Sequence, residues 1–236
     1  MDSPLDNCVK GHLPVTLLDW PGKMATVLFL GGCDFRCPFC HNPELAENRP
    51  SLKPVPMAEI DAYLAEKSGW IDGVVVTGGE PTLCRSLPEL LRSIKTKGYG
   101  VKLDTNGTRP DVLKRLIDDG LVDFIAMDIK SVPEKYEAAA GMPVDYADIS
   151  RSINLIISSG LDHEFRTTLY PPAVNLDDIV RIASELAKTG AKRYAVQQFN
   201  PKLCLSREAQ DVEPIGITHV EKAVETCRKS LETVLR

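Results

Sequence analysis

The chain has 236 residues, of which 43% are hydrophobic and 26% are charged, and its formal net charge at pH 7 is −5. This is the composition of a globular protein that is long enough to bury a full core. Because the net charge is negative, no overall basic field attracts nucleic acid, and we expect no nucleic-acid partner.

The N-terminal stretch MDSPLDNCVKG lacks the apolar segment of a secretory signal. No run of about 18 apolar residues predicts a membrane span. Without a signal, seven cysteines are not typical of a disulfide framework. The sequence therefore predicts a cytoplasmic protein, without membrane association, in which clustered cysteines bind a metal or carry out redox chemistry.

Short apolar runs bounded by turn residues predict six buried parallel strands. They are residues 24–32, 73–80, 100–107, 122–130, 163–170 and 193–199. Segments with apolar residues at helical spacing lie between the strands, and each ends in a glycine. They are residues 57–69, 87–98, 109–120, 148–160 and 175–190. A final helix is predicted from about Thr218 to Leu235.

This alternation of strands and helices predicts an α/β fold with right-handed crossovers. Six such units form either an open doubly wound sheet or an incomplete barrel, and the pattern alone does not choose between them. In both architectures, ligands bind at the carboxyl ends of the strands.

Chemically suggestive segments follow or end the predicted strands. They are a cysteine cluster, GGEP (78–81), DTNG (104–107), MDIK (127–130), Arg166 and QQFNP (197–201). Because the carboxyl ends of parallel strands meet at one edge of a sheet, these segments predict one composite active site.

The cysteine cluster consists of Cys33, Cys37 and Cys40, spaced C-x3-C-x2-C. A zinc site would need His41 or a distant cysteine as its fourth ligand, and closed zinc sites usually combine two separated ligand pairs. Three thiolates can instead hold a 4Fe–4S cluster, which leaves one iron open to a small molecule. A cluster used only for electron transfer and three unrelated buried thiols are further alternatives.

The cysteine spacing, with Phe39 before the last cysteine and GGEP after the next strand, resembles the radical S-adenosylmethionine (SAM) superfamily. The resemblance implies an incomplete (β/α)6 TIM-like barrel of parallel strands in a single domain, residues 1–236. An N-terminal turn over 1–22 would lead into a partial barrel over about 23–200. The resemblance also implies one 4Fe–4S cluster on the three cysteines, and SAM as the second cofactor.

Residues 15–45 resemble, more narrowly, the opening of glycyl-radical-enzyme activases. The similarity lies in the Asp19-Trp20-Pro21-Gly22 turn and in Cys40-His41-Asn42, although Trp20 and Lys23 stand where many activases have Gly and Arg. It is nearest to activases of anaerobic ribonucleoside-triphosphate reductase, with pyruvate formate-lyase activase a close relative. It implies a glycyl radical enzyme as protein substrate, and flavodoxin or ferredoxin as electron donor.

Other functions remain as alternatives at this point. One is activation of a different glycyl radical enzyme, such as pyruvate formate-lyase. Another is a radical SAM reaction on a small heterocycle or an RNA base. A zinc-binding module without catalytic activity is the most remote.

The resemblance implies cofactor-binding residues at the strand ends, and no catalytic residue beyond the cluster and SAM. They are Phe39, Gly78, Gly79, Glu80, Asp104, Thr105, Asp128, Lys130, Arg166 and Asn200. Within this set, Phe39 would lie near the adenine, Glu80 near the methionyl amine, and Asn200 near the ribose. Arg166 would clamp the SAM carboxylate, and Asp19 would meet the partner's glycine-bearing loop.

Asp104, Thr105 and Asp128 resemble a site for a monovalent cation beside the SAM carboxylate. The alternative is structural: Asp104 would cap the TNG turn, and Asp128 would pair with Lys130. Arg166 would then pair with an acid of the barrel. Asp19 could likewise cap its own turn, and Phe39 could only pack its loop. The four cysteines outside the cluster are expected to be isolated thiols, namely Cys8, Cys84, Cys204 and Cys227.

Overall fold

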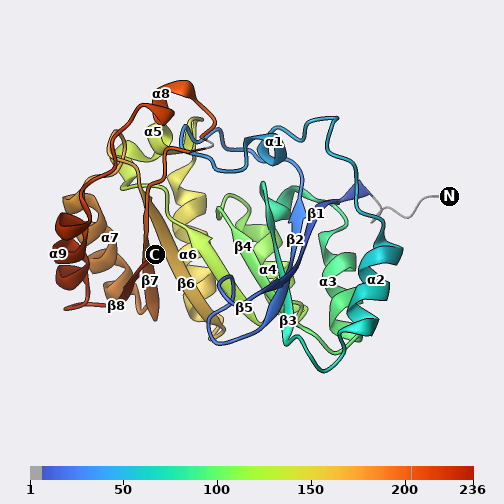
Figure 1. Ribbon diagram of the computed structural model, residues 1–236. Coiled ribbons are helices and arrows are strands. Elements are labelled where there is room, and N and C mark those ends of the chain that lie inside the picture. The colour runs from blue at the N-terminus through green and yellow to red at the C-terminus, as the bar shows by residue number, and fades with distance from the viewer. Residues whose placement is uncertain (1–6, 203) are drawn as a thin grey trace. The chain divides into compact units, whose positions relative to one another are not determined.

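The structure is a computed structural model that describes residues 7–202 and 204–236. The first six residues of the predicted N-terminal turn lie outside the described part of the chain. Eight strands follow one another in a single sheet in the order β1 to β8 (Figure 1). The β1–β2 pair is antiparallel, and β2–β3, β3–β4, β6–β7 and β7–β8 are parallel.

The six predicted strands correspond to β2–β7. Their bounds are β2 Ala25–Leu30, β3 Gly73–Gly78, β4 Gly100–Thr105, β5 Phe124–Asp128, β6 Asp162–Leu169 and β7 Arg193–Gln198. Two further strands were not predicted, β1 Val9–Thr16 and β8 Glu232–Leu235. The region predicted as an N-terminal turn therefore contains a strand.

The glycine-terminated patterns correctly predicted α2, α3, α4, α6 and α7, whereas the short helices α1, α5 and α8 were not predicted. They are α1 Pro43–Ala46, α2 Met57–Glu66, α3 Leu87–Thr96, α4 Pro110–Asp118, α5 Tyr136–Ala140, α6 Tyr146–Ser158, α7 Leu176–Thr189, α8 Arg207–Gln210 and α9 Ile217–Cys227. Short 3-10 segments are η2 Pro81–Leu83 and η3 Pro133–Lys135.

The prediction of a helix from Thr218 to Leu235 is wrong at its C-terminal end. The helix ends at Cys227, where the Ser230 and Leu231 amides fold back onto the Cys227 carbonyl at 2.9 and 3.0 Å. The remaining residues form β8, in which Thr233 and Val234 pair with β7. Their β-branched side chains favour a strand, and the partner strand decides the outcome.

Contacts within the chain group into two compact units. The first unit contains the residues up to Asp34, 44–105 and 111–125, and the second contains 35–43, 106–110 and 126–236. Each is described by itself below. That the chain forms a single domain stays a prediction.

In the first unit, β3 carries three consecutive valines, Val74, Val75 and Val76, and all are fully buried. A strand covered on both faces needs apolar side chains on both, which explains the continuous run. The helices α2 and α3 lie side by side next to these strands (Figure 1). The apolar face of α3 is buried through Leu90, Leu91 and Ile94.

Trp20, in the turn before β2, covers two glycines at the amino ends of β3 and β4. A Cβ on Gly73 would lie 2.6 Å from the Trp20 ring, and one on Gly100 would lie 3.1 Å from it. The ring is 3% exposed and also approaches Phe124, with 6.2 Å between ring centroids. The missing side chains of the two glycines therefore make room for the indole.

In the second unit, α7 and α9 lie side by side (Figure 1). The helix α7 begins with a reciprocal cap, in which Asn175 and Asp178 each accept a hydrogen bond from the other's backbone amide. No helix in residues 7–202 and 204–236 is long and apolar enough to span a membrane.

Candidate functional site

Cys33, in the first unit, lies directly after β2 in a segment held by backbone hydrogen bonds. The Gly32 and Cys33 amides donate to the carbonyls of Leu45 and Ala46, at 2.7 and 3.0 Å. The Cys33 side chain is half-buried and forms no disulfide. The structure thus places it at the carboxyl end of β2, as the sequence predicted.

The GGEP segment joins this same stretch of chain. The Gly79 amide donates to Leu30 O at 2.8 Å, and the Glu80 amide donates to Gly32 O at 2.7 Å. A Cβ on Gly79 would lie 2.0 Å from Gly32 O, and Gly78 has φ of +129°. Glycine is therefore required at both positions, because the backbones pass too closely for any side chain.

Glu80 is 1% exposed, and its carboxylate is a local acceptor. Its Oε1 accepts hydrogen bonds from the Thr82 amide at 3.0 Å, the Thr105 hydroxyl at 2.8 Å and the Thr82 hydroxyl. It thereby caps η2 and ties the GGEP segment to the end of β4. The predicted site residues Glu80 and Thr105 are thus in direct contact.

Asp104, also at the end of β4, is paired with a lysine of its own strand. Lys102 donates to Asp104 Oδ1, and the two side chains are 2% and 11% exposed. Lys102 also lies over the Phe124 ring, 5.8 Å from its centroid. The structure thus gives Asp104 a buried ion pair that sequence reasoning did not name, and its contact with the TNG turn stays a prediction.

Asp19 lies in the turn before β2, at the amino end of that strand, and it is exposed. Its carboxylate accepts a hydrogen bond from the Thr16 hydroxyl at 2.6 Å, and the Thr16 hydroxyl, rather than Asp19, accepts from the backbone amides of Leu18 and Asp19. Its role in meeting a partner protein stays a prediction.

Cys37 and Cys40, in the second unit, lie in a tight turn. The Cys40 amide donates to the Cys37 carbonyl at 3.0 Å. Cys37 is buried, and burial raises the pKa of its thiol to about 11, although the nearby Lys130 ammonium opposes the rise. A bound iron would have to displace this proton, since the thiolate is the form that ligates metal.

Asp128 is held between two cations of the second unit. Lys130 Nζ lies 2.9 Å from its Oδ2, and Arg166 Nε lies 2.8 Å from its Oδ1. Burial opposes ionisation of Asp128, but the charges of Arg166 and Lys130 outweigh it and hold its pKa well below the usual range. Burial likewise opposes the charge on Lys130, and Asp128 outweighs it and raises the pKa of the lysine. The two structural contacts considered from sequence, Asp128 with Lys130 and Arg166 with a barrel acid, are both present.

Phe39 begins a row of aromatic rings. Its ring lies 5.0 Å from that of Tyr170, which lies 5.1 Å from that of Phe199. The next residue, Asn200, is exposed, and its backbone carbonyl accepts a hydrogen bond from His41 Nε2 at 3.0 Å. The Asn200 side chain accepts from the Lys202 amide at 3.0 Å. Phe39 therefore packs its loop, and any contact with adenine stays a prediction.

Two cysteines predicted to be isolated are joined. Cys8 and Cys84 form a disulfide with 6.6 Å between their Cα atoms, so that prediction is wrong. The chain brings together two positions that are 76 residues apart in sequence, and no local pattern signals this. The other five cysteines form no disulfide, namely Cys33, Cys37, Cys40, Cys204 and Cys227.

The three cluster cysteines suit an iron–sulfur cluster by their donor chemistry. Within the described part of the chain, no three His, Cys, Asp or Glu side chains converge on a single metal ion. A 4Fe–4S cluster needs no such convergence, because each thiolate binds a different iron. All three cysteines follow β2 in the chain and none is used in a disulfide, so their donor chemistry fits the group.

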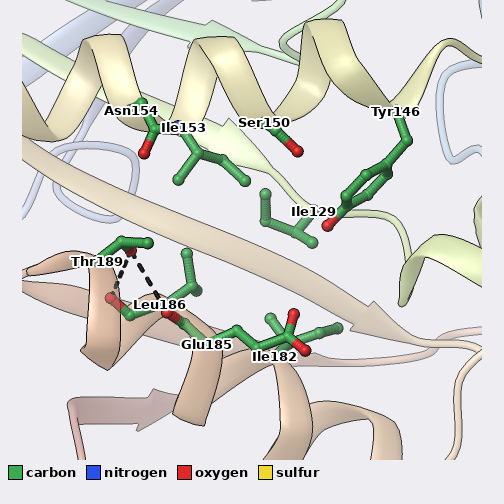
Figure 2. Close-up of a pocket in the computed structure, with 9 residues that line it drawn as sticks. All are labelled: Ile129, Tyr146, Ser150, Ile153, Asn154, Ile182, Glu185, Leu186 and Thr189. Carbon is green, nitrogen blue, oxygen red and sulfur yellow. Dashed lines mark hydrogen bonds between the residues drawn. The ribbon is translucent and has the colours of Figure 1, made fainter.

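A cavity of about 230 Å³ lies elsewhere in the second unit, between α6 and α7. Figure 2 shows side chains of the two helices facing each other across it, with Ile129 between them. Isoleucine and leucine side chains of α6, α7 and the segment after β5 form its apolar lining, and Tyr146, Ser150 and Glu185 contribute polar groups. None of the predicted site residues lines it.

Comparisons with known proteins identify the family. The model described as "Radical SAM superfamily" matches residues 27–195. A Methanocaldococcus jannaschii protein named "Putative glycyl-radical enzyme activating enzyme" is 36% identical over 201 residues, which are 82% of this chain and 80% of that protein. A "Pyruvate formate-lyase-activating enzyme" of Staphylococcus epidermidis is 32% identical over 152 residues, which are 57% of this chain and 59% of that protein.

Among solved structures, that of Streptococcus suis SuiB bound to S-adenosylmethionine matches with a TM-score of 0.68. The identity is 14%, and the match covers 87% of this chain and 48% of that one. A likeness at this identity concerns the fold alone. It confirms the predicted class, an α/β fold with a mostly parallel sheet of the partial TIM-barrel type.

The family match covers most of the chain, and it includes the strand ends at which the structure places the cysteines and the GGEP segment. Membership implies an enzyme that uses a 4Fe–4S cluster and SAM. The chain belongs to the radical SAM superfamily and, within it, to the glycyl-radical-enzyme activating enzymes.

Proposed function

We propose that this enzyme generates a glycyl radical on anaerobic ribonucleoside-triphosphate reductase. The observation that carries the activase function is the sequence match over 82% of the chain to a protein named as such an activating enzyme. The finer choice of partner rests on the resemblance of residues 15–45 to activases of that reductase. Activation of pyruvate formate-lyase is the competing assignment.

The three cysteines would hold the cluster, and its fourth iron would take SAM. When bound, the two cofactors supply the reductive cleavage that provides a carbon radical for hydrogen abstraction from a glycine. The protein contributes binding, orientation and exclusion of water.

The GGEP segment presents backbone groups and one carboxylate to the ligand. Because Gly78 and Gly79 lack side chains, the GGEP segment lies directly against the backbone of Leu30 and Gly32 at the end of β2, where the cysteine loop begins. Glu80 is held rigid by the Thr82 and Thr105 hydroxyls. A fixed, buried carboxylate is suited to the methionyl ammonium of SAM.

Arg166 and Lys130 are suited to the SAM carboxylate, but both engage Asp128 in this structure. The Arg166 guanidinium uses its Nε for Asp128, and a carboxylate ligand would engage its terminal nitrogens. Asp128 would then orient the guanidinium, since a paired side chain loses less freedom on binding.

A monovalent cation beside Asp104 or Asp128 would have to compete with cationic side chains. Each carboxylate already has a cationic partner within its own unit, Lys102 for Asp104 and Lys130 with Arg166 for Asp128. The physiological electron donor is proposed from the chemistry alone, as flavodoxin or ferredoxin.

The activity is tested with anaerobically reconstituted protein, dithionite and SAM. We expect 5′-deoxyadenosine from the wild type and none from Cys37→Ser, whereas Cys227→Ser, which changes a buried cysteine outside the cluster, should match the wild type. A wild-type protein that binds no iron, or that leaves SAM intact, would refute the proposal.

The partner is tested by adding the glycine-bearing domain of each candidate enzyme to the loaded protein. We expect the doublet of a glycyl radical in the electron paramagnetic resonance spectrum with the reductase. A doublet with only the lyase would reassign the partner and leave the activase function intact. Deoxyadenosine production without a doublet from any partner would instead favour a small-molecule substrate.

A further inference from the structure

Two uncharged polar side chains lie beside each other at the carboxyl ends of β6 and β7. Thr168 is the next-to-last residue of β6, and Gln197 is the next-to-last residue of β7. The two strands are parallel, and their register sets Thr168 opposite Gln197. The Thr168 hydroxyl donates a long hydrogen bond, 3.5 Å, to Gln197 Oε1. The two side chains therefore form one small hydrogen-bonding surface.

This pair lies on the face of the sheet that carries Arg166. Side chains at alternate positions of a strand share a face, and Thr168 follows Arg166 by two residues. Arg166 contacts Asp128 on that face, at 2.8 Å. The alternating residues Thr167 and Leu169 are buried on the other face. The pair thus extends the Asp128 and Arg166 cluster toward the carboxyl ends of the strands.

Both side chains keep hydrogen-bonding capacity that the protein does not use. The Gln197 amide nitrogen donates to none of the residues that the structure describes. The neighbouring Gln198 differs, because its amide nitrogen donates to the Ile215 carbonyl at 3.0 Å. Thr168 and Gln197 are only half-buried, so a bound molecule can reach them.

The chemistry of the pair matches a peptide backbone. A glutamine amide and a threonine hydroxyl each contain a donor and an acceptor, and neither carries a charge. A peptide group likewise offers one N–H donor and one C=O acceptor. The carboxylate of SAM is instead suited to cationic groups such as Arg166 and Lys130.

The position of the pair along β6 separates it from the groups suited to SAM. Residues two apart on one face of a strand lie about 7 Å from each other along the strand. A molecule bound at Thr168 would therefore lie beyond Arg166, closer to the strand ends. A protein loop that approaches from the carboxyl side of the sheet would meet Thr168 and Gln197 first.

We propose that Thr168 and Gln197 bind the backbone of the partner enzyme's glycine-bearing loop. The inference rests on the proposed function, because it needs a protein substrate. Hydrogen bonds to main-chain groups hold a loop in place whatever side chains it carries, and they can orient a glycine Cα for hydrogen abstraction. The two residues bind substrate and take no part in the hydrogen transfer.

The test uses Gln197→Met and Thr168→Val, which nearly keep the size of each side chain and remove its hydrogen-bonding groups. The full-length protein is reconstituted anaerobically, and the KM for the glycine-bearing domain is measured from the rate of glycyl radical formation. We expect each variant to raise this KM about 3- to 10-fold, as for the loss of one hydrogen bond. The dissociation constant of SAM, measured by calorimetry, should match that of the wild type.

Two further variants serve as controls. Gln198→Met changes the neighbouring glutamine, which points to the opposite face, and it should leave the KM for the domain unchanged. Thr168→Ser keeps the hydroxyl and should retain the KM of the wild type.

Equilibrium binding gives a second readout that needs no turnover. The glycine-bearing domain is titrated into reconstituted protein with SAM and without reductant. We expect its affinity for Gln197→Met to be about 3- to 10-fold below its affinity for the wild type and for Gln198→Met.

An unchanged KM and an unchanged affinity for the domain in both Gln197→Met and Thr168→Val would overturn the inference. Weaker binding of SAM to these variants would also overturn it, because that result assigns the pair to the cofactor. Failure of the proposed function looks different, because the wild-type protein would then form no glycyl radical on any partner, and the inference would fail with it.

Discussion

The Trp20 indole packs against Gly73 and Gly100, which have no side chains. We therefore predict that Gly100→Ala destabilises the wild-type protein but stabilises a Trp20→Ala variant. In the wild type, the Cβ of Gly100→Ala would lie 3.1 Å from Trp20 Cη2. The indole is 3% exposed and cannot swing away, so overpacking should cost about 1–2 kcal/mol. The φ of Gly100 is not in the left-handed region. Without the indole, alanine should therefore stabilise the fold by about 0.5 kcal/mol, through the entropy of the unfolded chain.

The assay is urea denaturation of the two single variants, the double variant and the wild type. Trp20→Ala alone should cost about 3 kcal/mol as a large-to-small core change. The coupling energy between the two sites should then be about 2 kcal/mol in favour of the double variant. Gly11→Ala is the control, because its Cβ would contact only Phe29, at 3.4 Å, and its effect should be the same in both backgrounds. Equal destabilisation by Gly100→Ala with and without Trp20 would refute the packing argument.

Three further predictions concern charge and covalent links. Cys84→Ser should lower stability by about 4 kcal/mol under non-reducing conditions, because a cross-link spanning 76 residues constrains the unfolded chain; labelling all seven thiols in unreduced wild type would contradict it. Asp128→Asn should cost about 2 kcal/mol at pH 7, less than a fully buried pair because the aspartate side chain is 28% exposed. Ion pairing lowers the pKa of Asp128, so the stability that the ionised carboxylate contributes to the wild type should decrease as the pH falls below about 4. The free energies of unfolding of the wild type and of Asp128→Asn, measured with urea, should therefore approach each other as the pH is lowered through this range. Glu80→Gln should keep the fold, since an amide oxygen can still cap Thr82, while SAM affinity measured by calorimetry falls about 10-fold or more; unchanged affinity would exclude the carboxylate from the binding site.

The six strands that were predicted from sequence contain continuous apolar runs, and the two that were not predicted, β1 and β8, do not. β2 to β7 contain short apolar runs, because parallel strands are covered on both faces. β1 contains Lys10, Gly11, His12 and Pro14 and is the first strand of the sheet. Edge strands tolerate polar residues and proline, so their sequences do not differ clearly from those of loops. β8 was not predicted because its apolar residues continue the helical spacing of α9. Only its pairing with β7 shows that this segment is a strand and not an extension of the helix.

The positions of the site residues were predictable, while several of their contacts were not. The apolar runs that predict β2, β3 and β4 also put Cys33, Glu80 and Asp104 at the carboxyl ends of these strands, where parallel sheets bind ligands. The sequence carried no sign of the bond between Cys8 and Cys84.

Some ion pairs of the site follow from local sequence spacing, and others depend on how the strands are arranged. Lys102 and Asp104 are two residues apart in β4, and alternation along a strand places such residues on the same face. The spacing between Asp128 and Lys130 is the same, so both pairs could be predicted from sequence. Arg166 reaches Asp128 from 38 residues away, on a different strand, and only the register between strands brings them together. The resulting balance of charge is thus set partly by local spacing and partly by the fold, and around Asp128 it favours the ionised carboxylate before any cofactor is bound.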